Sequence, residues 1–237
     1  MKRRNVITAI GTLAVGTGTV LGTGATEVLS SNSDGSFRVV SPGANISIDV
    51  PSSPGQNVSV FEDGNTDGGI DFETLEPDDL PKVHVIERSS TLDGDMVEIQ
   101  VAVEADQDKN LGNILDITNN NTSDDYYVGF EFTELGTAVT DGSITKQEAY
   151  TAFQFKHGDS TTVSTGTSSD STEPANYVTV PADAGTESVE LAVDTTAKNI
   201  KDALSPGDFR DNSESTSKSI TLIDEVTAVA TQTDPSA

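Results

Sequence analysis

The segment Asp63–Asp71, with the sequence DGNTDGGID, has the residue spacing of an oxygen-rich cation site. A Ca²⁺-binding loop of this kind places side-chain oxygens at alternate positions and a glycine at the sharp turn. The spacing predicts four residues whose side-chain oxygens would bind the cation: Asp63, Asn65, Asp67 and Asp71. Gly68 would allow the sharp turn, and Ile70 would anchor the loop to apolar neighbours. Position twelve is Thr74 rather than a bidentate Glu. Two interpretations stay open: a structural Ca²⁺ site, or a solvated acidic loop.

The two histidines do not form a catalytic pattern. His84 stands in an alternating apolar segment, which favours a packed strand residue. His157 precedes Asp159 and Ser160, but a Ser-His-Asp triad is a spatial arrangement and not a run of neighbours. The sequence contains neither a Gly-x-Ser-x-Gly elbow nor a His-Glu-x-x-His motif. We therefore expect a protein that is not an enzyme, with a secreted hydrolase as the weakest of three function classes.

Charge and composition restrict the partners further. The formal net charge is −26, and acidic residues are spread along the whole chain. Such a charge repels nucleic acid and anionic lipid, and it is typical of the solvated surface of a salt-loving organism's protein. An acidic face for cations is the alternative. The chain has no cysteine, which excludes disulfides and thiolate metal sites.

The N-terminus predicts export. Lys2, Arg3 and Arg4 precede a mildly apolar stretch to Leu21, and Ala25 ends a small-residue cleavage motif. This is the pattern of a cleavable signal peptide over residues 1–25, of the twin-arginine or the Sec type. The stretch is too short and too weakly apolar to be a stable membrane anchor. Cleavage would leave a mature chain of net charge −26 − 3 = −29.

Four asparagines stand in the N-x-S/T context of N-glycosylation: Asn45, Asn57, Asn120 and Asn121. In a secreted protein these are candidate acceptors in surface loops. Asn120 and Asn121 overlap, so we expect only one of the two to be used.

The clearest structural unit is Leu111–Gly136. Ile114 to Thr118 predicts a strand and Asn119 to Asp125 a polar turn. Tyr126 to Thr133 predicts a second strand, because Tyr126, Val128, Phe130 and Phe132 alternate with more polar residues. We interpret the unit as a hairpin in the interior of a sheet.

Further alternating segments predict nine or ten short strands in all. Residues 82–87 and 97–103 predict a hairpin, and helices are expected over 143–153 and 195–204. After the signal, residues 26–36 form a polar arm, and 37–237 form one domain with an acidic loop at 62–81 and a Ser/Thr-rich loop at 161–172. The expected fold is all-β: an antiparallel jelly-roll-like β-sandwich with one or two short helices.

The signal ending at Ala25, the early strand and the phrase ITNNNT before YYVGFEF together resemble the TasA/camelysin-like secreted proteins and their haloarchaeal relatives. The resemblance covers about half the chain in patches. It implies a jelly-roll domain that polymerises into extracellular fibres or pili when an N-terminal strand is donated to the next subunit.

We therefore expect an exported structural protein that self-associates into a homopolymer at the cell surface or in the extracellular matrix. The arm is the candidate donor strand, with Val28 and Leu29 as its apolar residues. The alternative is a monomeric surface binding module or adhesin stabilised by Ca²⁺.

Overall fold

The computed structural model describes residues 6–9, 36–40, 45–61, 70, 80–88, 96–104, 106–158, 161–166, 171–203, 219–220 and 222–235. In chain order the elements are β1 (Val6–Ala9), β2 (Ser36–Val40), β3 (Ile46–Asp49), β4 (Val58–Phe61), β5 (Lys82–Arg88), β6 (Met96–Glu104), β7 (Asp108–Asn119), β8 (Tyr126–Leu135), α1 (Thr137–Thr140), α2 (Lys146–Ala152), β9 (Phe153–His157), β10 (Thr161–Thr162), β11 (Val178–Val180), β12 (Thr186–Asp194), α3 (Lys198–Ala203), β13 (Ser219–Ile220) and β14 (Ile223–Thr231).

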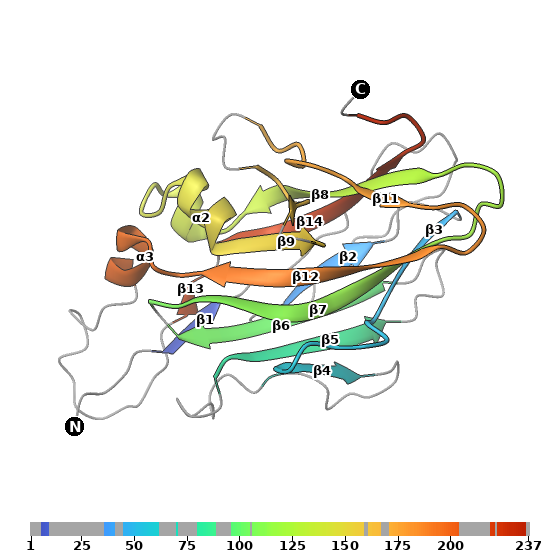
Figure 1. The fold of residues 1–237 in the computed structure, drawn as a ribbon. Helices are drawn as coiled ribbons and strands as arrows, with labels where there is room; N and C mark the ends of the chain where they lie inside the picture. Colours follow the sequence, from blue (N-terminus) through green and yellow to red (C-terminus); the bar gives the residue numbers. More distant parts are fainter. Residues whose placement is uncertain are drawn as a thin grey trace.

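The strands form three sheets (Figure 1). Sheet A has the order β13-β1-β6-β5-β4, with β2 also paired to β6; sheet B has the order β10-β9-β12-β7-β3; sheet C has the order β11-β8-β14. All pairings are antiparallel except β1 with β13 and β4 with β5. The predicted all-β sandwich is therefore confirmed, with a few short helices.

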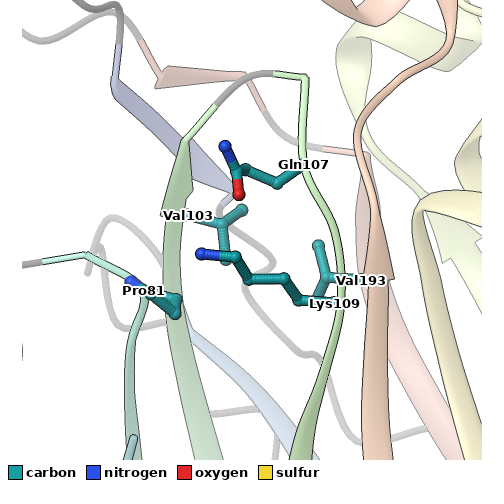
Figure 2. Close-up of a pocket in the computed structure, with 5 residues that line it drawn as sticks. All are labelled: Pro81, Val103, Gln107, Lys109 and Val193. Atoms are coloured by element: carbon teal, nitrogen blue, oxygen red, sulfur yellow. The ribbon is translucent and has the colours of Figure 1, made fainter.

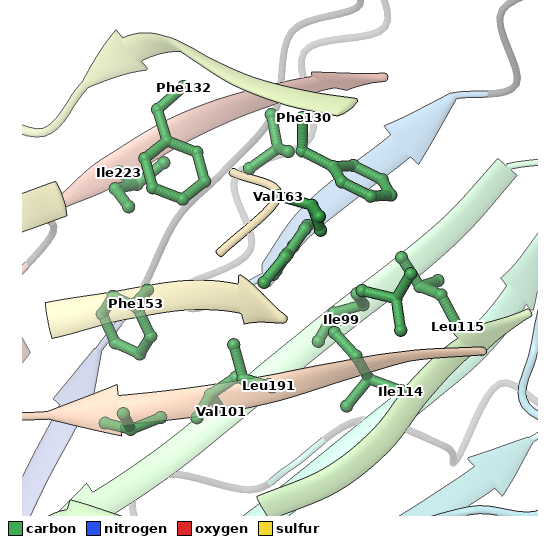
Figure 3. Packing of buried hydrophobic residues seen from close by; sticks show 14 of the residues in the cluster. Ile99, Val101, Ile114, Leu115, Phe130, Phe132, Phe153, Val163, Leu191 and Ile223 are labelled. Atoms are coloured by element: carbon green, nitrogen blue, oxygen red, sulfur yellow. The ribbon is translucent and has the colours of Figure 1, made fainter. Parts of the chain in front are cut away.

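Apolar side chains from all three sheets meet in one core (Figure 3). Ile99 and Val101 come from sheet A, Leu115 and Leu191 from sheet B, and Phe130 from sheet C. The ring of Phe130 packs edge-on against that of Phe155 on β9, with centroids 4.8 Å apart. Edge-to-face packing of this kind adds to the burial energy of large aromatic side chains. Sheets B and C are thus held together by their own aromatic residues, although the chain has few of them.

The predicted segment Leu111–Gly136 contains two strands, as expected, but they do not form a hairpin. β7 pairs with β12 and β3, whereas β8 pairs with β11 and β14. Both are interior strands, yet the turn between them crosses from sheet B to sheet C. Asn119 is fully buried at this crossing, and its side-chain amide donates to the carbonyl oxygens of Asp124 and Val180 at 3.0 Å each. These bonds direct the chain out of sheet B.

The Ser/Thr-rich segment at 161–172 is only partly a loop. Thr161–Thr162 form β10, and Val163, Ser164 and Thr165 are fully buried. The amide of Val163 donates to Phe155 in sheet B, and its carbonyl accepts from Phe130 in sheet C. Because the two hydroxyl groups also accept backbone amides, of Phe155 and Phe132, these polar residues lie in the interior without an energetic penalty.

The two predicted helices are present with shifted ends, and a third short helix, α1, was not predicted. Helix α2 begins after Thr145 rather than Ser143 because Thr145 and Glu148 form a reciprocal capping box. Helix α3 occupies the middle of the predicted segment 195–204. In Figure 1 both helices lie at one end of the sandwich, opposite the β7–β8 turn.

The remaining predicted strands are found close to their expected bounds, and 82–87 and 97–103 form the antiparallel hairpin β5–β6. Three strands are not predicted by the sequence: β1 inside the predicted signal peptide, β9 directly after the predicted helix, and β10 in the predicted Ser/Thr-rich loop. The apolar residues of β1 fit a signal peptide equally well, so the sequence predicts no strand there.

Candidate assembly edge and acidic loop

Strand β6 has two differently constructed edges. One edge is covered by β5 along its length, from Lys82 opposite Ala102 to Arg88 opposite Met96. The other edge is shared end to end by two strands. β2 pairs with residues 96–100, and β1 pairs with residues 101–104.

β1 is an interior strand of sheet A. On its far side it runs parallel to β13, with Thr8 opposite Ser219 and Ala9 opposite Ile220. A four-residue segment of the predicted signal peptide thus lies between β6 and β13. The predicted donor residues Val28 and Leu29 lie outside the described residues. The last residue of the predicted arm, Ser36, is the first residue of β2.

The four predicted Ca²⁺ ligands, Asp63, Asn65, Asp67 and Asp71, also lie outside the described residues. Ile70 between them is described, and it is only 6% exposed. Its amide donates to Gln100 Oε1 on β6 at 2.5 Å. The expectation that Ile70 anchors the acidic loop agrees with this burial. Among the described residues, no three acidic or histidine side chains are grouped so that they could hold a metal ion.

The acidic loop meets sheet A at a row of buried polar side chains. His84 and Gln100 stand opposite each other on β5 and β6, and Glu98 is two residues away on β6. All three are nearly inaccessible to solvent. Gln100 Nε2 donates to Glu98 Oε1 at 3.0 Å, and the ring of His84 packs on Phe61 with centroids 4.7 Å apart. His84 is therefore a packed strand residue, as the sequence indicates.

The described contacts of His157 are with a backbone carbonyl group and a carboxylate. Its Nδ1 lies 3.1 Å from the carbonyl oxygen of Ser188, and its Nε2 lies 3.6 Å from a Glu187 carboxylate oxygen. Asp159 and Ser160 lie outside the described residues. The described partners of His157 are thus a backbone carbonyl and a carboxylate, and neither is a nucleophile that a base would activate.

The candidate glycan acceptors differ in how their side chains are used. Asn45 is exposed, but its Nδ2 donates to the Tyr126 hydroxyl at 3.0 Å. Asn121 is half-buried, and its Oδ1 accepts the amides of Ser123 and Asp124. Asn57 and Asn120 are exposed, and neither side chain bonds to any residue that the structure describes. The side chains of Asn57 and Asn120 are therefore the two that a glycan could use without breaking a described hydrogen bond.

Two polar features were missed in the sequence. Asp116 is 5% exposed in β7, where its carboxylate accepts the amide of Ser52 at 2.8 Å and the hydroxyl of Ser188 at 2.7 Å. The sequence around it, Ile-Leu-Asp-Ile, places a charged residue inside an apolar run. This pattern could have indicated a buried carboxylate with hydrogen-bond partners. Asp116 ties the segment before β4 to sheet B.

The second feature lies on the outer face of sheet C. Burial, and then the neighbouring Glu173 carboxylate, raise the pKa of Glu131. Burial, followed by Glu131 and Glu173, raises the pKa of Tyr177. The cluster is acidic and holds two carboxylates near one phenol.

A shallow depression lies beside the end of β6 and is lined by Pro81, Val103, Gln107, Lys109 and Val193 (Figure 2). Three of its five lining side chains are apolar, and Lys109 supplies its one positive charge. The depression contains no enclosed space for a small molecule.

No helix within the described ranges is long and apolar enough to cross a membrane. Comparison with protein-family models, with curated proteins and with solved structures found no match to this chain.

Proposed function

We propose that this chain is a non-enzymatic, exported structural protein of the cell surface or extracellular matrix, which assembles into a homopolymer by β-strand donation. The observation that carries the proposal is the position of β1 between β6 and β13. The resemblance to the TasA/camelysin-like proteins implies the same mode of assembly.

Cleavage after Ala25 would remove β1 from the interior of sheet A. Backbone groups of β6 over residues 101–104 would then lose the strand with which they pair. A gap in a sheet with unpaired N–H and C=O groups is a template for an added strand, either from the same chain or from another one. The mature protein would thus have an incomplete sandwich with a defined groove.

The donor in this proposal is the arm, residues 26–36. Val28 and Leu29 are adjacent, so in a strand they point to opposite faces and only one can face the core. Burying one such side chain contributes about 1.5–3 kcal/mol. Backbone pairing must supply the rest, and assembly is therefore expected to depend on protein concentration. High salt would favour it by screening the charge of the mature chain.

The test is electron microscopy at high salt of a chain that begins at Thr26. Filaments are expected from this chain and not from a chain that begins at Ser36. The double substitution Val28→Ala and Leu29→Ala should weaken assembly, whereas Ser30→Ala with Ser31→Ala is the matched control and should not. Filaments from the chain that begins at Ser36 would exclude the arm as the donor.

A second candidate is a monomeric surface module stabilised by Ca²⁺. The burial of Ile70 favours it, because the predicted Ca²⁺ loop is fastened to sheet A at that residue. Calorimetry with EDTA and with added Ca²⁺ tests this candidate. A Ca²⁺-dependent rise in melting temperature should be lost in Asp63→Ala with Asp67→Ala and retained in Asp78→Ala with Asp79→Ala. A melting temperature that is insensitive to Ca²⁺ would exclude the site.

A further inference from the structure

The geometry points to a regulatory role for β1: the signal segment occupies the assembly groove until cleavage, and its removal admits the arm of a second copy of this chain. This inference rests on the proposed strand donation. It adds the identity of the groove, the direction of the donor and the event that opens the groove.

The register of sheet A shows how the groove is filled. β1 runs antiparallel to β6, from Val6 opposite Glu104 to Ala9 opposite Val101. β2 continues in the same direction, from Ser36 opposite Gln100. Two segments far apart in the sequence therefore occupy consecutive positions on one strand.

After cleavage, the most direct way for the same chain to fill the groove is to extend β2 backwards in its own register. Continuing the register of β2 would place Gly35, Asp34, Ser33 and Asn32 opposite Val101, Ala102, Val103 and Glu104 respectively. Asn, Asp and Gly are unfavourable in strands. Ser33 and Gly35 would replace Ile7 and Ala9 as the partners of Val103 and Val101. If the same chain filled the groove in this way, a serine and a glycine would stand where β1 has an isoleucine and an alanine.

The apolar residues of the arm cannot reach the groove from their own chain in this register. Val28 and Leu29 would stand beyond Glu104, where β6 ends. The arm of a second copy has no such restriction, because it is not continuous with the β2 of the accepting subunit. It can place Val28 or Leu29 opposite Val101 or Val103, which are core residues. The occupant that fits the groove better is therefore a second copy.

The position of β1 also gives the polarity of the contact. A donor that replaces β1 runs antiparallel to β6 and parallel to β13. The donor arm and the acceptor groove are different surfaces of one chain. Such a heterologous contact produces open filaments unless a rotation closes the ring.

Engineered disulfides can test this cleanly because the chain has no cysteine. Thr8 and Ala102 are cross-strand partners, and Cα atoms of antiparallel partners lie about 4.5–5.5 Å apart, within the range of a disulfide. The full chain with Thr8→Cys and Ala102→Cys, purified uncleaved and oxidised, locks β1 in place. The control is Lys82→Cys with Ala102→Cys in a chain that begins at Thr26, because that bond joins β6 to β5 and leaves the groove open.

Light scattering and electron microscopy then distinguish the outcomes. We expect the control to assemble and the locked full chain to stay monomeric. Assembly of the locked chain at the rate of the control would overturn the role of β1 while leaving strand donation intact. Failure of every chain that begins at Thr26 to assemble would overturn the proposed function itself.

A second cross-linking experiment separates the two possible donors. Mixing a mature Ala102→Cys chain with mature chains that carry one cysteine at Glu27, Val28, Leu29 or Ser30 should give an intermolecular disulfide. A mature chain with Asp34→Cys and Ala102→Cys should give no intramolecular one. The reverse pattern would show that the groove is filled by the same chain.

Discussion

The three sheets of the fold are built in different ways. Sheets B and C rest on long strands: β7, β8, β12 and β14 have 12, 10, 9 and 9 residues. Sheet A surrounds one long strand, β6, with short ones; β1, β2 and β4 have only 4, 5 and 4 residues. A short strand contributes few hydrogen bonds and can be exchanged at low cost, whereas a long interior strand cannot leave without unfolding its sheet. We therefore expect sheets B and C to supply most of the stability of the fold. Sheet A is where we expect one strand to be replaced by another.

The largest expected effect is in the aromatic contact between sheets B and C. Phe155 is fully buried against Phe130, so Phe155→Ala should lower the free energy of unfolding by about 3–5 kcal/mol. Denaturant titration at high salt measures this. Phe155→Leu is the matched control and should cost less than half as much, because Leu refills most of the apolar volume. Equal costs for the two variants would contradict this.

The next effect concerns the crossing between sheets B and C. Asn119→Ala removes three hydrogen bonds, two donated by the side-chain amide and one accepted from the Asn121 amide. The Val180 carbonyl would be left buried without this donor, and we expect a loss of about 2–3 kcal/mol. The exposed neighbour Asn120→Ala should change stability by less than about 0.5 kcal/mol. Equal effects in the two variants would contradict the role of Asn119.

Close packing on the outer face of sheet C gives a third test. A Cβ atom at Gly129 would lie 2.6 Å from the Pro174 side chain, so Gly129→Ala should destabilise the fold by about 1–3 kcal/mol. At Gly166 the nearest atom to an added Cβ is Ala175 Cβ, at an ordinary 3.5 Å. Gly166→Ala is therefore the control, and its melting temperature should stay close to that of the parent chain.

Removing β1 should cost less than any of these core changes. A chain that begins at Thr26 loses the few hydrogen bonds of one four-residue strand, each worth about 0.5–1.5 kcal/mol net and partly offset by chain entropy. We expect a loss of stability below about 2 kcal/mol. A chain that cannot fold without residues 1–25 would show that β1 is a permanent strand.

The smallest expected effect is a pH dependence on sheet C. A carboxyl whose pKa is raised in the folded state binds more protons there than in the unfolded state, so its contribution to stability falls as pH rises through that window. Because the pKa of Glu131 is raised by burial and by Glu173, Glu131→Gln should gain stability relative to the parent chain between acidic and neutral pH. The same substitution should lower the pKa of Tyr177, which ultraviolet titration can follow. Glu190→Gln on sheet B is the control and should leave the Tyr177 titration unchanged.

Alternation of apolar residues was enough to predict most strands, because a half-buried strand imposes a period of two wherever it lies. The alternation did not predict which strands pair. The apolar patterns of β7 and β8 would be the same whether the two strands formed a hairpin or belonged to two different sheets. Ser164 and Thr165 were missed as interior residues, because only the fold shows that their hydroxyls accept backbone amides. β1 was missed because an apolar N-terminal run is typical of a signal and of a strand alike.

For the candidate site, too, some features could be predicted from the sequence and others could not. The arm and the acidic loop stay predictions from composition, whereas the burial of Ile70 agrees with its place in the motif. The edge of β6 could not be predicted, because strand order and register depend on contacts between distant segments.

The most direct test of the account is hydrogen exchange at the β6 amides of residues 101–104, compared between the mature monomer and its assembled form. The account predicts that those amides of this segment that point toward the β1 position exchange rapidly in the monomer and become protected on assembly. The amides that face β5 should be protected in both states. Assemblies in which the groove-facing amides exchange as fast as in the monomer would contradict strand donation at this edge.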